Sequence, residues 1–218
     1  MTKHFRRELE IIKKRILTLG SLVEDRVRLA VQAVDQIDAE IAQRIIKTDY
    51  EIDEMEVEIE EECLKVLALH QPVAVDLRFI IAVIKINAEL ERIGDQAVNI
   101  AERVEIIAKR PKPPFMFDYS VMGEKAQRML KMSLDALVNL DVDIAYKVIM
   151  MDDEVDQIKK DAYDKIKQAI QNLPERVGYY INLLLISRHL ERLADHATNV
   201  AEEVIYLVEG EIYRHVPY

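Results

Sequence analysis

Apolar residues recur three and four positions apart along almost the whole chain, the spacing that places them on one face of an α-helix. In the first half they form three such stripes, over residues 9–34, 41–67 and 79–104. The second stripe stops before Pro72, because the residue that precedes a proline disfavours helical backbone angles. This pattern predicts three long helices in the first half, the second of them continuous to about His70.

A proline-rich stretch separates this half from the rest: residues 109–115 read Lys-Arg-Pro-Lys-Pro-Pro-Phe and cannot be helical throughout. The same cycle then returns, with helices predicted over about 120–139 and 141–171, a break at Pro174 and a last helix to about residue 208. We therefore predict an all-α fold of two tandem three-helix bundles with six long helices, one bundle over residues 1–110 and the other over residues 111–218. The scarcity of helix breakers, with only 5 Gly and 6 Pro, favours the same class.

The two halves also repeat each other in their residues. Residues 89–102, Glu-Leu-Glu-Arg-Ile-Gly-Asp-Gln-Ala-Val-Asn-Ile-Ala-Glu, align without a gap with residues 189–202, His-Leu-Glu-Arg-Leu-Ala-Asp-His-Ala-Thr-Asn-Val-Ala-Glu. Upstream, residues 49–53 align with residues 152–156 at an offset that differs by three, which indicates a three-residue deletion at the turn of the second copy. The chain is therefore predicted to be an internal duplication.

Each copy carries two pairs of carboxylates four residues apart, so each pair lies on one face of its helix. Asp53 and Glu91 are equidistant from Pro72, as are Asp49 and Asp95, so they meet if the chain reverses at this proline. In the second copy the corresponding reversal falls at the other helix-breaking proline. Four carboxylates are therefore predicted to face one another in each bundle: Asp49, Asp53, Glu91 and Asp95 in the first, and Asp152, Asp156, Glu191 and Asp195 in the second.

So much negative charge at close quarters requires a counter-charge or protonation. Oxygen-only ligands suit magnesium, manganese or iron, whereas the lack of nearby cysteine and the few histidines disfavour a tetrahedral zinc site. Asn99 and Asn199, one turn further along, are candidate additional ligands, and Arg92 and Arg192 are the alternative source of neutralising charge. The simplest alternative is a solvated face without a metal, because carboxylates four apart on a helix usually have that role.

Net charge, cysteine content and the lengths of apolar runs limit the possible partners and the cellular location. The formal net charge of −10 disfavours nucleic acid and anionic membrane surfaces as partners, since both carry phosphate. Cys63 is the single cysteine, so no internal disulfide is expected, and its acidic neighbours favour a buried, unreactive thiol. The first residues resemble no signal peptide and no apolar run is long enough to span a bilayer, so we predict a cytoplasmic protein without direct membrane insertion.

The repeated acidic motifs, Glu91-Arg-Ile-Gly-Asp95 and Glu191-Arg-Leu-Ala-Asp195, match the E(D)xxxD pattern of the PhoU family of bacterial regulators of phosphate uptake, which the chain resembles over nearly its whole length. Residues 71–78, Gln-Pro-Val-Ala-Val-Asp-Leu-Arg, carry the same resemblance. It implies two three-helix bundles whose carboxylates hold multinuclear metal clusters, usually of iron, with zinc, manganese or magnesium as alternatives. It also implies a protein that couples a phosphate ABC transporter to a sensor histidine kinase and represses uptake and the phosphate-starvation response when phosphate is plentiful. Homodimers or larger oligomers are common among such proteins, and a homodimer is expected here.

The second copy departs from this pattern at several places. Arg176-Val-Gly178 stands where the first copy has Asp76-Leu-Arg78, so a role of Arg78 is not duplicated. Ala194 replaces the glycine of the motif, and a small residue there is expected to allow close approach of two helices. Two histidines, His189 and His196, flank the second motif where the first has Glu89 and Gln96, so they are not expected to be ligands common to both copies.

Three functions follow from these features. The first is a metal-binding, non-catalytic regulator of phosphate transport and phosphate-starvation signalling, as the resemblance implies. The second is a carboxylate-bridged di-metal enzyme in a helical bundle, although the usual Glu-x-x-His pattern is missing because Gly94 and Ala194 stand at the histidine positions. The third is a metal-free helical scaffold whose carboxylates are solvated.

Overall fold

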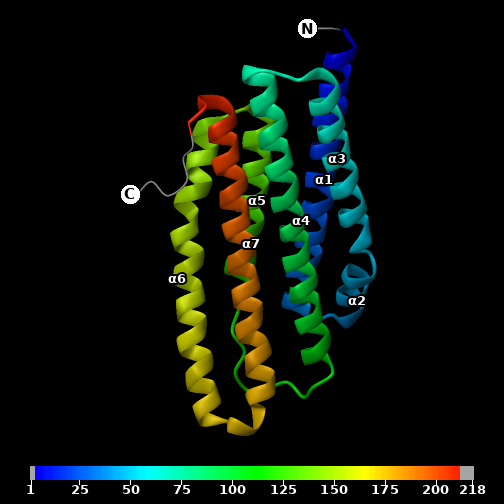
Figure 1. Ribbon diagram of the computed structural model, residues 1–218. Coiled ribbons are helices and arrows are strands. Elements are labelled where there is room, and N and C mark those ends of the chain that lie inside the picture. Colours follow the sequence, from blue (N-terminus) through cyan, green and yellow to red (C-terminus); the bar gives the residue numbers. More distant parts are fainter. Residues whose placement is uncertain (1–2, 212–218) are drawn as a thin grey trace.

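The computed structural model describes residues 3–211, and in this part of the chain all regular structure is helical. Two short elements, α2 (Ala39–Lys47) and the 3₁₀ turn η1 (Pro174–Arg176), accompany six long helices whose axes run roughly side by side (Figure 1). The long helices are α1 (Lys3–Gln36), α3 (Tyr50–His70), α4 (Ala74–Ala108), α5 (Ser120–Asn139), α6 (Val142–Asn172) and α7 (Val177–Glu209). The predicted all-α fold with six long helices is confirmed. None of the described helices is both long and apolar enough to cross a membrane.

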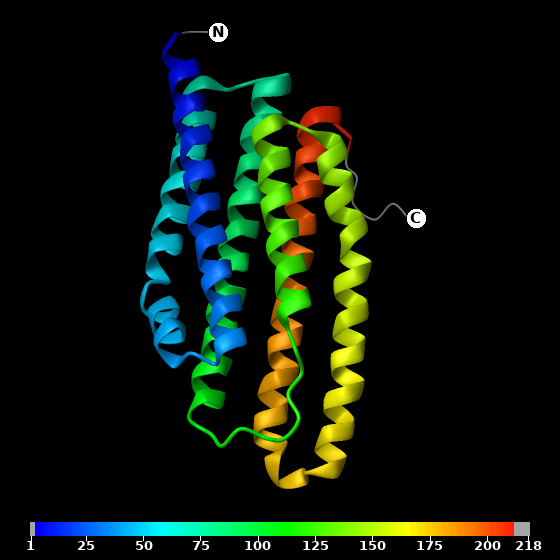
Figure 2. The same ribbon diagram turned by 180° about the vertical axis from the view of Figure 1, so that it is seen from behind.

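The helices form two three-helix groups in chain order. In the first, α1, α3 and α4 contact one another pairwise, with α2 packed on α4; in the second, α5, α6 and α7 do the same. The proline-rich segment between α4 and α5 is non-helical and crosses one end of the molecule (Figure 2). The exact domain boundary at residue 110 stays a prediction, and positions 1–2 and 212–218 of the predicted domains lie outside the described residues.

The two bundles share one apolar core, because α4 packs along α7 and α1 along α5. The α1–α5 contact is so close that a Cβ added to Gly20 would lie 2.7 Å from Leu134, and one added to Gly123 would lie 2.6 Å from Val31. Gly20 and Gly123 are equivalent in the two copies, as are Val31 and Leu134. The copies therefore meet as two subunits of a symmetric dimer do, with each contact repeated in both directions.

The first helix of each copy ends in the same way. Ile37 and the equivalent Leu140 adopt left-handed backbone angles, with φ near 52° in both. The next residue, Asp38 or Asp141, caps the following helix by accepting hydrogen bonds from its first backbone N–H groups. The aspartates stabilise the start of the next helix, while the left-handed residue carries a steric cost because neither residue is glycine.

The second helix of the first copy differs from the prediction. Instead of one helix to His70, the chain breaks at Thr48 into α2 and α3. The guanidinium of Arg26, which is 4% exposed, donates to the carbonyls of Ile45 (2.9 Å) and Thr48 (3.0 Å) and pairs with Glu51. At the break these two carbonyls accept backbone hydrogen bonds only from residues three positions on, Thr48 N–H and Glu51 N–H, and Arg26 supplies each with a second donor. The second copy has the apolar Met129 in place of Arg26, and there α6 is continuous.

We expect Leu140→Gly to be more stable than Leu140→Ala by about 1 kcal/mol, because only glycine removes the steric cost of left-handed backbone angles. Both substitutions delete the same side chain, which is 52% exposed, so the comparison cancels the loss of its contacts. Urea unfolding followed by circular dichroism measures the difference. Equal stabilities would show that the turn after α5 carries no such strain.

Candidate metal centres

The first carboxylate cluster lies between α3 and α4. The turn after His70 folds α4 back along α3, so Asp49 and Asp53 at the start of α3 come close to Glu91 and Asp95 in the middle of α4. The structure also brings in Glu56, one turn beyond Asp53, which the sequence comparison missed. Glu56 follows Asp53 by three residues, so spacing alone could have placed both on one face of the helix. The repeat gave no support, because the equivalent residue of the second copy has the opposite charge.

Partial burial and mutual repulsion raise the pKa values of the first cluster. Partial burial, followed by the charges of Asp95, Asp53 and Glu56, raises the pKa of Glu91 to about 7, against a smaller opposing effect of Arg92. Partial burial and neighbouring carboxylates also raise the pKa of Asp49 and of Asp95. These carboxylates lack sufficient positive charge around them, so protons or cations are bound favourably there.

The second cluster has the same construction between α6 and α7. Partial burial and the charges of Asp156, Asp153 and Glu191 raise the pKa of Asp152 to about 6. Asp195 also has a pKa raised to about 6, by desolvation and by its acidic neighbours, although part of its side chain reaches solvent. Glu191 and Asp195 line an open groove of about 970 Å³ along α6 and α7.

One substitution makes the two clusters electrostatically different. Lys159 stands in the second copy where Glu56 stands in the first. Its ammonium group donates a hydrogen bond to Glu191 and lies 3.9 Å from Asp156. Burial would lower the pKa of Lys159, but these carboxylates outweigh it and raise that pKa. At this position the second cluster therefore has a cation, whereas the first has a carboxylate.

The donor sets fit hard cations, the first more completely than the second. Both clusters offer carboxylate oxygens alone, which suit magnesium, manganese and iron. A cation in the second cluster would have to displace the Lys159 ammonium from Glu191. Within residues 3–211, no three of these carboxylates have oxygen atoms that all lie within 4.8 Å of one another, so the side chains face each other without closing around one point.

The other predicted residues lie beside the clusters. Asn199 donates to Glu89 (2.9 Å), and so does Arg92 (3.0 Å), so both are engaged with a carboxylate outside the two motifs. Asn99 is half-buried one turn beyond Asp95 on α4, and Arg192 is exposed at the rim of the groove. Whether Asn99 or Asn199 adds a ligand stays a prediction.

The flanking histidines serve the contact between the bundles. His196 Nδ1 lies 2.8 Å from Glu89 Oε2, and His189 Nδ1 lies 2.9 Å from Gln96 Oε1. The two pairs join equivalent positions in opposite directions, so they follow the same pseudo-two-fold symmetry as the glycine contacts. Burial opposes ionisation of Glu89, but hydrogen bonds from His196 and Asn199 lower its pKa overall. The alignment of Glu89 with His189 and of Gln96 with His196 was the signal that could have predicted these pairs.

The glycine of the first motif sets the distance between α3 and α4. A Cβ added to Gly94 would lie 2.9 Å from Cδ1 of Ile52, so the helix that carries Glu91 and Asp95 approaches α3 closely only without a side chain there. In the second copy both positions change together: Ala194 replaces glycine and the smaller Val155 replaces isoleucine, and both are fully buried. The expectation that a small residue here allows close helix approach holds for Gly94.

Fold and sites together define a class: a duplicated three-helix-bundle protein with one carboxylate cluster between the last two helices of each bundle. Comparison with known proteins identifies the family, since the family model of the PhoU domain matches residues 16–104 and again residues 119–204. The chain belongs to the PhoU family.

Similar proteins agree with this assignment over nearly their full lengths. The chain is 37% identical to the phosphate-specific transport system accessory protein PhoU homolog of Pseudomonas aeruginosa, over 99% of this chain and 90% of that one. It is 32% identical to the PhoU accessory protein of Escherichia coli, over 97% of this chain and 88% of that one. The crystal structure of PhoU from Pseudomonas aeruginosa superposes with a TM-score of 0.90 at 37% identity, covering 95% of this chain and all of that one.

We expect Gly94→Ala to destabilise the protein by about 1 kcal/mol, the balance of an overpacking cost of roughly 1–3 kcal/mol and a gain in helix propensity. Adding Ile52→Val, which reproduces the pair of the second copy, should recover most of that loss. Urea unfolding of both single variants and the double variant completes a double-mutant cycle. Additive effects would contradict the proposed contact between these side chains.

We expect the metal-free protein to lose stability as the pH rises from about 4.5 to about 7, since the pKa of Glu91 is raised on folding and the folded state therefore favours its protonated form. Glu91→Gln should raise the melting temperature at pH 8 and flatten this dependence. The measurement is thermal unfolding in the presence of a chelator. Glu61→Gln, on the exposed face of α3, is the matched control and should change neither quantity.

Proposed function

We propose that this protein is a metal-binding accessory protein of phosphate transport that represses phosphate uptake and the phosphate-starvation response when phosphate is plentiful. The observation that carries the proposal is the pair of carboxylate clusters at equivalent places of the two repeats, whose pKa values are raised by partial burial and by the neighbouring carboxylates. The names of the relatives, which describe phosphate-specific transport system accessory proteins, supply the process.

The metal would be held by the carboxylates that already face one another. Asp49, Asp53, Glu91 and Asp95, together with Glu56, would bind it in the first bundle, and Asp152, Asp156, Glu191 and Asp195 in the second. We infer multinuclear iron, with zinc, manganese or magnesium as alternatives. Bound cations supply positive charge that offsets the repulsion between α3 and α4 and between α6 and α7.

Neutralisation of this charge would then fix the positions of the two helices in each bundle and so the surface that they form. Asp49 directly precedes α3 and Asp53 lies on it, whereas Glu91 and Asp95 lie on α4, so a shared counter-charge joins two helices that otherwise repel each other along this face. A phosphate ABC transporter and a sensor histidine kinase would read that surface through protein contacts. The protein acts in this scheme as a cytoplasmic homodimer and carries out no catalytic step.

We expect the quadruple variant Glu91→Ala/Asp95→Ala/Glu191→Ala/Asp195→Ala to fold but to lose its bound metal, because each cluster loses two of its facing carboxylates. Metal content is measured by mass spectrometry on protein purified without a metal-affinity tag. In a bacterium that lacks its own PhoU, wild-type protein should lower the rate of radioactive phosphate uptake at high external phosphate severalfold, and the variant should not.

The matched control replaces four exposed carboxylates outside the clusters by alanine: Glu54, Glu61, Asp143 and Glu175. This control removes the same number of negative charges. It therefore distinguishes the loss of specific metal ligands from a general loss of negative charge. The proposal fails if wild type and the quadruple variant hold equally little metal after loading with iron or manganese. It also fails if wild-type protein leaves phosphate uptake unchanged.

A further inference from the structure

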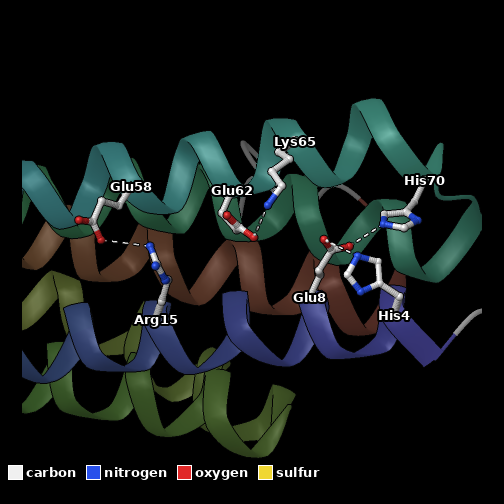
Figure 3. A network of polar contacts seen from close by, with 7 residues as sticks. All are labelled: His4, Glu8, Arg15, Glu58, Glu62, Lys65 and His70. Atoms are coloured by element: carbon white, nitrogen blue, oxygen red, sulfur yellow. Dashed lines mark hydrogen bonds and ion pairs between the residues drawn. The ribbon is translucent and has the colours of Figure 1, made fainter.

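Two histidines and a glutamate meet where the N-terminal end of α1 lies beside the C-terminal end of α3 (Figure 3). His4 and Glu8 are one turn apart on α1, and His70 is the last residue of α3. Their ligand atoms all lie within 4.8 Å of one another, and within residues 3–211 no other three His, Cys, Asp or Glu side chains converge in this way. This His–Glu–His group lies outside both carboxylate clusters and shares no residue with them.

Glu8 is the centre of the group. Its Oε2 lies 2.5 Å from Nε2 of His70, and its Oε1 lies 3.4 Å from Nε2 of His4, so each oxygen faces a different imidazole. Glu8 is only 5% exposed, which makes it one of the few buried charged residues within residues 3–211. A buried carboxylate requires a cationic or hydrogen-bonding partner, and here both partners are side chains that also bind metals.

The surroundings hold the group in place on one side and leave it open on the other. The ring of Phe5, which is buried, packs against the ring of His70 with a centroid separation of 5.0 Å. The side chain of His70 is 19% exposed, whereas that of His4 is 73% exposed. Two ligands are therefore positioned by the folded protein, and the third approaches from solvent and can adjust its position.

We propose that His4, Glu8 and His70 bind one divalent first-row transition cation, with Zn²⁺ as the representative ion. Two imidazoles and one carboxylate form a donor set found in zinc sites that keep a further position for water, and imidazole distinguishes it from the oxygen-only sets that suit magnesium. The solvent-facing side beside His4 provides that position. The cation would replace the direct hydrogen bond between His70 and Glu8.

The bound cation would link the first two turns of α1 to the end of α3. These segments are far apart in the sequence, and the His–Glu–His group is a polar contact between them at this end of the bundle. A ligand that binds only the folded state stabilises it in proportion to its concentration and affinity. The site thus gives the first bundle a metal-dependent clamp with different ligand chemistry from the carboxylate clusters.

Titration with Co²⁺ tests the proposal, because Co²⁺ with imidazole ligands and low coordination number absorbs visible light strongly, whereas six-coordinate Co²⁺ on oxygen ligands absorbs weakly. We expect the full chain to develop the strong absorption with one equivalent of Co²⁺ and to lose it on addition of Zn²⁺. His4→Ala should weaken binding by about 100-fold or more, since loss of even an outer-shell partner costs roughly 10–100-fold. Because His4 is exposed, this variant should retain the wild-type melting temperature without metal.

Two further variants distinguish binding at the His–Glu–His group from binding elsewhere on the protein. Glu10→Gln alters an exposed carboxylate on the same helix and should titrate like wild type. The quadruple variant of the carboxylate clusters should keep the strong absorption, so failure of this site and failure of the proposed function are distinguishable. Absence of the absorption in wild type, or equal titration of wild type and His4→Ala, would overturn the proposal and leave a histidine–carboxylate hydrogen bond only.

Discussion

The packing of α4 against α7 is the contact on which the rest of the structure depends. These two helices carry both acidic motifs, and each is also the helix against which the other members of its bundle pack. Their shared surface is mostly apolar, and its polar contacts include the pairs Glu89–His196, Glu89–Asn199, Gln96–His189 and Lys85–Glu203. Because a buried polar group must find its partner, these pairs disfavour any other register of the two helices and so place the two clusters relative to each other.

The duplication has kept the framework symmetric while the clusters have diverged. Equivalent glycines allow α1 and α5 to approach, and equivalent aspartates cap the second helix of each copy. In contrast, Glu56 and Lys159 give the two clusters a difference of two charges at one position. The first cluster therefore has the greater need for an external cation, whereas the second already contains part of its counter-charge. In a metal-binding regulator, the two sites would respond to different cation concentrations.

Metal chemistry of two kinds would then act at separate places in the first bundle. The carboxylate cluster lies along the facing surfaces of α3 and α4, and the His–Glu–His group joins α1 to the last residue of α3. Hard cations favour the former and imidazole-binding cations the latter. Both would restrain α3, which contributes to the bundle core with fewer buried residues than α4. In this scheme the position of α3 would be the feature of the first bundle that metal binding affects most.

The helical periodicity of apolar residues and the internal repeat determined much of this structure from the sequence alone. Apolar spacing and proline positions predicted the six long helices, and the carboxylates equidistant from Pro72 do come together, because an antiparallel helix pair with a short turn brings equidistant residues into register. Tertiary structure alone decided features that depend on partners distant in the sequence. Arg26 on α1 stabilises a helix break that local preferences do not show, and His4, Glu8 and His70 converge only when α1 packs on α3. The spacing of residues in the sequence does not predict such contacts, because the packing angle and offset of two helices depend on the whole core.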